Sequence, residues 1–131
     1  MTATHQKHIY LKDLHFEHNL WLNELSFAKD ELAIFTNRLS EVEARNTSPE
    51  FSALAESLQN RLVRQQEVVH DLRHEIKLHE SALAHYASEH PIAIDRVHFA
   101  DQEGLREKMT RFTLLYAEFK AEFMRFIGRW M

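Results

Sequence analysis

Cysteine is absent from the chain, and glycine and proline occur only twice each in 131 residues. The lack of cysteine excludes a disulfide framework and thiolate metal sites, so any bound metal must take imidazole and oxygen ligands. The scarcity of glycine and proline disfavours sheets with many tight turns. Together with 44% hydrophobic and 27% charged residues, this composition predicts an all-α fold.

The chain also lacks an excess of basic residues and any long apolar run. Its 16 basic and 20 acidic residues are mixed along the sequence and give a formal net charge of −4, so there is no basic stripe for phosphate and we expect no nucleic-acid partner. No stretch approaches the roughly 18 apolar residues of a membrane helix, and the N-terminus does not resemble a signal peptide. We therefore expect no membrane partner and a cytoplasmic location.

Three stretches place apolar residues alternately three and four positions apart, which is the pattern of amphipathic helices. The pattern predicts three long helices, over roughly residues 11–46, 49–89 and 98–130. Ser48 supplies an N-cap for the second helix and Pro49 its first position. Pro91 ends that helix, because the residue before a proline avoids helical geometry.

Short connections force neighbouring helices to run antiparallel. The sequence therefore predicts an antiparallel bundle of three long helices that forms a single domain, residues 1–131, since this length fits one domain. A four-helix variant with a break near Gln66 or Gly104 is the alternative, as is a dimeric bundle.

The first helix carries a second apolar stripe outside the core pattern. Its members are Ile9, Phe16, Leu20, Phe27 and Ile34. A regular apolar stripe of this length is unusual on the surface of a monomer. It predicts a homodimer formed through the outer face of the first helix.

All ten histidines lie within residues 1–18 and 70–98. In an up-down-up bundle these two windows meet at one end, so we expect a spatial cluster of imidazoles there. His18, His79 and His98 occupy core positions, where burial without partners costs free energy and requires hydrogen bonds, carboxylates or a metal.

Several of these residues have the spacing of a chelating pair on one helix face. His15 and His18 are three residues apart, and Glu75 and His79 are four apart, so each pair is close enough to bind one ion. Other carboxylates at the same height are Glu17, Glu80, Asp95 and Glu103. The predicted metal ligands are His8, His15, His18, His70, His74, Glu75, His79, His85, His98 and Asp101.

The leading hypothesis is a protein that binds one or more transition-metal ions, zinc, copper or iron, in a site that could be multinuclear. Any enzymatic activity would then be metal-centred, either hydrolytic or redox. The alternative is a metal-free coiled-coil interaction module with a pH-sensitive histidine cluster. Loss of thermal stability on chelation distinguishes the metal site from the module.

Overall fold

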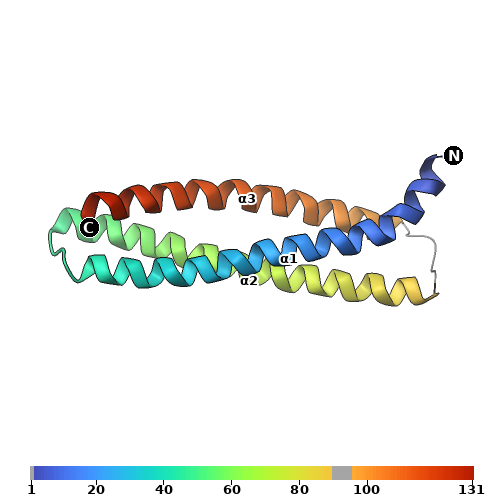
Figure 1. Cartoon of the computed structure of the whole chain (residues 1–131), viewed down its shortest axis with the longest axis horizontal. Helices are drawn as coiled ribbons and strands as arrows, with labels where there is room; N and C mark the ends of the chain where they lie inside the picture. Colours follow the sequence, from blue (N-terminus) through green and yellow to red (C-terminus); the bar gives the residue numbers. More distant parts are fainter. Residues whose placement is uncertain (1, 90–95) are drawn as a thin grey trace. The chain divides into compact units, whose positions relative to one another are not determined.

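The computed structural model describes the backbone of residues 2–89 and 96–131 and the side chains of residues 12–89 and 98–131. Within these ranges it contains three α-helices and no strand (Figure 1). The helices are α1 (Thr2–Glu43), α2 (Pro49–Glu89) and α3 (Arg96–Trp130). The all-α prediction is confirmed, and the four-helix variant does not occur, because α2 continues through Gln66 and α3 through Gly104.

The turn between α1 and α2 forms as the sequence predicts. The Ser48 hydroxyl accepts a hydrogen bond from the backbone N–H of Phe51 at 3.2 Å, which satisfies one of the unpaired donors of the first turn of α2. The Asn46 side chain donates to the carbonyl oxygens of Val42 and Trp130 at 2.9 and 3.0 Å. The turn is therefore held to both α1 and α3.

Contacts divide the chain into two compact units, and each helix contributes to both. Unit 1 comprises Met1–Leu25 and Asp71–Thr110, and unit 2 comprises Ser26–His70 and Arg111–Met131. The single domain over residues 1–131 stays a prediction.

Unit 2 has an aromatic and aliphatic core. The rings of Phe35 and Phe123 stack with centroids 4.6 Å apart, and those of Phe51 and Phe126 stack at 5.4 Å. On its α1/α3 side, Glu31 accepts hydrogen bonds from Tyr116 and Lys120, each at 2.7 Å. Its buried hydrophobic residues are Ala28, Leu32, Phe35, Leu39, Val42, Phe51, Ala55, Leu58, Leu62, Val69, Phe112, Tyr116, Phe119, Phe123, Phe126 and Ile127.

Unit 1 has a mixed core, in which polar side chains interrupt the apolar packing. Its buried hydrophobic residues are Leu14, Trp21, Leu25, Leu72, Ile76, Leu83, Leu105 and Met109. His18, His79 and Gln102 are buried among them. Residues 15–18 of α1 contact Glu80 of α2 and Gln102 of α3, so all three helices contribute to this core.

The outer apolar stripe of α1 is exposed where its side chains are described. Phe16, Phe27 and Ile34 are 63–64% exposed and Leu20 is 51% exposed, whereas the side chain of Ile9 lies outside the described residues. The homodimer predicted from this stripe stays a prediction. A search of the described residues found no helix with the length and apolar character needed to cross a membrane.

Candidate functional site

His18 lies at the centre of the candidate site, and both of its ring nitrogens are engaged. The side chain is 1% exposed, at a position of α1 that the helical pattern assigns to the core. Its Nδ1 is hydrogen-bonded to Glu80, and its Nε2 lies 2.7 Å from Oε1 of Gln102. These bonds make a buried imidazole compatible with the core, because an unpartnered one would lose its hydration without compensation.

The Gln102 side chain joins the two buried histidines. Its Nε2 donates to a carboxylate oxygen of Glu17 at 2.7 Å, which fixes the orientation of the amide. Its Oε1 therefore faces the imidazoles, 2.7 Å from Nε2 of His18 and 3.0 Å from Nε2 of His79. Because an amide oxygen only accepts hydrogen bonds, each of these ring nitrogens must carry a proton.

Glu80 is the acceptor on the other side of the His18 ring. Burial alone would raise the pKa of Glu80, but hydrogen bonds from His18 and His15 outweigh it and leave that pKa below the ordinary 4.5. Glu80 is thus an ionised acceptor, and Nδ1 of His18 donates to it. Both ring nitrogens of His18 therefore face acceptors, and when both are protonated the ring forms a charge-assisted pair with Glu80.

His15 completes the environment of Glu80 at the surface. Its Nδ1 donates to the second carboxylate oxygen of Glu80, and its Nε2 accepts a hydrogen bond from the side chain of Asn19 at 3.4 Å. One carboxylate therefore receives one hydrogen bond from an exposed imidazole and one from a buried imidazole.

On the opposite side, Arg106 anchors Glu17. The guanidinium donates to both carboxylate oxygens of Glu17, from Nε at 2.9 Å and Nη2 at 2.8 Å, and to Glu103 from Nη1 at 2.7 Å. Burial alone would raise the pKa of Glu17, but the hydrogen bonds from Arg106 and Gln102 outweigh it and lower that pKa. The ionised Glu17 in turn holds the Gln102 amide in place.

His79 is the buried group of this site whose charge is disfavoured. Its ring lies 5.3 Å from that of His18 and 6.3 Å from that of His98, centroid to centroid. Burial lowers the pKa of His79 below its ordinary 6.5, and the charge of His18 lowers it further, while Asp101 and the bond to Gln102 offset only part of this. A neutral His79 therefore fits the folded unit best. We call His18, His79, Glu80, Gln102 and Glu17 the histidine layer.

The structure brings several of the predicted ligands together. His15, His18 and His79 belong to the histidine layer or bond to it, and His98 lies beside His79 with its ring 4.8 Å from that of Tyr86. Asp101 is exposed and acts on His79 through its charge.

The other predicted ligands have different surroundings. Both carboxylate oxygens of Glu75 accept hydrogen bonds from Lys108, each at 2.7 Å. His74 and His85 are exposed on α2, and His70 is exposed in unit 2. The side chain of His8 lies outside the described residues.

Sequence reasoning identified the imidazoles but not all of their partners. Glu17 and Glu80 stand among the carboxylates expected at this height, but the bonds of Glu17 to Gln102 and of Glu80 to two histidines were not individually predicted. The sequence pattern does single out Gln102, because it is a polar residue at a core position of the third helical series. The sequence pattern does not single out Arg106, because a basic residue on a charged helix face has the same pattern whether or not it binds a carboxylate.

Among the described side chains, no group of three or more histidine, aspartate or glutamate residues is arranged to hold a metal ion. The predicted zinc, copper or iron site stays a prediction. Comparison of the chain with protein-family models, with curated proteins and with solved structures gave no match.

Proposed function

We propose that this chain is a helical interaction module in which unit 1 changes its packing when the pH falls below neutral. The observation that carries this proposal is the hydrogen bonding of Gln102, whose single amide oxygen accepts from both His18 and His79. Both hydrogen bonds require a proton on the histidine nitrogen that faces Gln102. A further proton in the site adds charge among buried side chains, where water does not easily replace a lost hydrogen-bond partner.

Acidification adds a charge at an unfavourable position. When His79 takes up a second proton, it becomes a cation whose ring lies 5.3 Å from that of His18, and charge on His18 lowers the pKa of His79. The described groups of the other helices that act on its pKa are His18 of α1 and Asp101, Gln102 and His98 of α3. Among the described side chains, Asp101 opposes the repulsion by its charge, and its exposure to water weakens this effect.

The sign of the pH dependence follows from the direction of each shift. Because the pKa of folded His79 lies below 6.5, the unfolded chain binds this proton more readily, and stability is lost as the pH falls from 6.5 through the folded pKa. The pKa values of Glu17 and Glu80 lie below 4.5, so their contributions are lost only in more acidic solution. Stability should therefore decline in two stages.

The test is the free energy of unfolding in urea at pH 7.5 and at pH 5.5, for the unmodified chain and for His79→Gln. Glutamine keeps an N–H donor for Gln102 and does not titrate, so this variant should lose less stability between the two pH values. His85→Gln is the matched control, since His85 is exposed on the same helix, and it should behave like the unmodified chain. Equal losses in all three proteins would refute the proposed role of His79.

The predicted metal function differs from this proposal at His18. A metal ion binds an unprotonated ring nitrogen, so it would have to displace Glu80 or Gln102 from His18. We expect untagged protein to show the same melting temperature before and after chelation. Stoichiometric zinc, copper or iron whose removal lowers the melting temperature would instead establish a metal centre and overturn the module. The homodimer through α1 and the cytoplasmic location stay predictions.

A further inference from the structure

We propose that unit 2 pairs with a second copy of this chain through the outer face of α3, in an antiparallel arrangement. The surface involved is an uncharged row of exposed residues spaced three and four positions apart. We call this row the α3 seam; it consists of Leu114, Ala117, Ala121, Met124, Gly128 and Met131. This site is independent of the histidine layer, which lies in unit 1.

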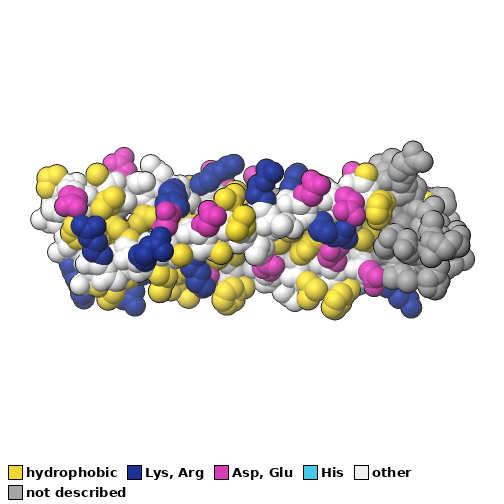
Figure 2. Space-filling model, turned by 90° about the horizontal axis from the view of Figure 1, so that it is seen from above, with side chains coloured by type: hydrophobic (Ala, Val, Ile, Leu, Met, Phe, Trp, Pro, Cys, Tyr) yellow, Lys and Arg dark blue, Asp and Glu magenta, His cyan; other side chains and the backbone are white. Residues whose placement is uncertain are grey.

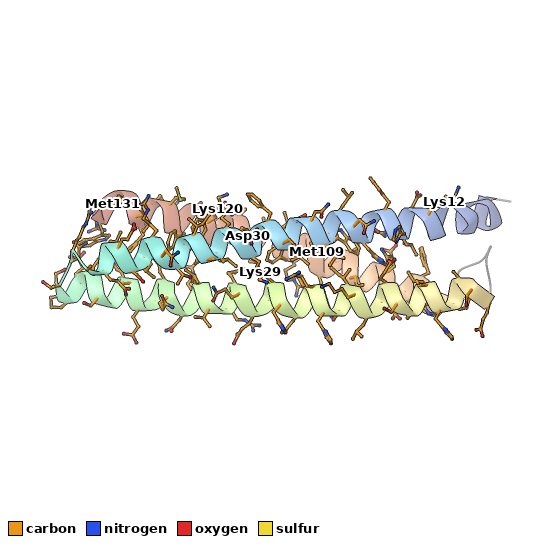
Figure 3. All side chains as sticks on the ribbon, turned by 60° about the horizontal axis from the view of Figure 1, so that its bottom comes forward. Lys12, Lys29, Asp30, Met109, Lys120 and Met131 are labelled. Atoms are coloured by element: carbon orange, nitrogen blue, oxygen red, sulfur yellow. The ribbon has the colours of Figure 1, made fainter. Side chains whose placement is uncertain are left out.

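The α3 seam has the pattern of a coiled-coil contact, and all of its residues are exposed. Leu114, Met124 and Met131 are 61%, 54% and 59% exposed, and no charged residue interrupts the row. Figure 2 shows hydrophobic side chains reaching the surface between charged ones on the face that it draws. Lys120 and Met131, labelled in Figure 3, mark this stretch of α3.

The neighbouring face of α1 extends the apolar surface of unit 2. Phe27, Glu31 and Ile34 lie on one side of α1, because they are four and three residues apart. Glu31 contacts α3 through Tyr116 and Lys120, so Phe27 and Ile34, each 64% exposed, flank the same boundary. Two helices, not one, therefore offer apolar side chains to a partner.

The charges beside the seam indicate that the partner is a second copy. Glu118 and Arg125 are exposed, seven residues apart on one edge of the seam, and neither forms an ion pair within the described part of the chain. When two α3 helices pair antiparallel about a point between Glu122 and Phe123, Glu118 of each copy faces Arg125 of the other. The surface is thus complementary to itself, as a twofold interface requires.

The same register fits the sizes of the side chains. Ala121 of one copy lies opposite Met124 of the other, and Ala117 lies opposite Gly128, so the small residues allow the two backbones to approach closely. The antiparallel register one heptad away would place Glu118 against Glu118 and Lys120 against Lys120. A parallel pair would bring Lys120 near Arg125. Like charges disfavour both alternatives.

The test is sedimentation equilibrium of the full chain over a range of concentrations. We expect a monomer–dimer equilibrium that Ala121→Glu weakens at least about tenfold, because it places a carboxylate in the apolar contact. The matched control is Ala53→Glu, at an exposed position of α2, which should leave the dimer unchanged. Circular dichroism verifies that each variant stays helical.

Exchange of the flanking charges tests the register. Glu118→Arg and Arg125→Glu should each weaken the dimer about tenfold at low salt, because each replaces two attractive pairs by two repulsive ones. The double variant should restore the original affinity to within about threefold. A monomer at all concentrations, or a dimer that Phe16→Glu dissociates and Ala121→Glu does not, would overturn the proposal, and the second outcome would assign the dimer to α1.

Discussion

At the scale of single residues, His18 shows that a buried imidazole is stabilised by hydrogen bonds as well as by apolar packing. Its Nδ1 is hydrogen-bonded to Glu80, and its Nε2 is hydrogen-bonded to Gln102. We therefore expect His18→Leu to destabilise the chain by about 1–3 kcal/mol, although leucine suits a core position, because the variant leaves a buried amide oxygen and a carboxylate with fewer donors. Urea denaturation at pH 7.5 measures this loss.

Removal of the partners along with His18 provides the control. In the triple variant His18→Leu, His79→Leu and Gln102→Leu, the three buried polar side chains disappear together, and replacing buried partners jointly by apolar side chains is often neutral. Glu80 keeps its bond from His15, and Glu17 keeps its bonds from Arg106. The triple variant should recover most of the stability lost by His18→Leu. If it is less stable than the single variant, then packing volume and not hydrogen bonding explains the effect.

At the scale of the helices, the sequence was sufficient for the architecture. The three-and-four spacing of apolar residues and the Ser48–Pro49 signal located the elements, because both reflect local backbone chemistry and burial of one face. The start of α1 at Thr2 was not predicted, since the apolar series begins only at Leu11.

The details of the histidine layer required the register of three helices. Folding the chain back at its turns placed His18 near the segment around Ile76, and the structure pairs it with Glu80, one helical turn away. A shift of one turn decides whether a carboxylate reaches an imidazole, and the sequence pattern does not fix register more finely than that. The pairing of Glu75 with Lys108 illustrates the same limit. Surface charges have many partners within reach.

At the scale of the whole chain, the histidine layer belongs to unit 1 and the stacked aromatic core to unit 2, so the two units should respond differently to acid. The chain has two tryptophans, one in each unit. Trp21 packs beside His18 with ring centroids 5.8 Å apart, whereas Trp130 packs beside Phe51 at 5.3 Å. Each tryptophan therefore reports on one unit.

The two single-tryptophan variants make this prediction measurable. During acidification from pH 7.5, the fluorescence of Trp21 in Trp130→Phe should change at a higher pH than that of Trp130 in Trp21→Phe, because His79 and the carboxylates of the histidine layer lie in unit 1. Adding His79→Gln should move the Trp21 transition to lower pH and leave the Trp130 transition in place. Coincident transitions in both variants would mean that the chain responds to acid as one cooperative body, and that the histidine layer does not act on unit 1 alone.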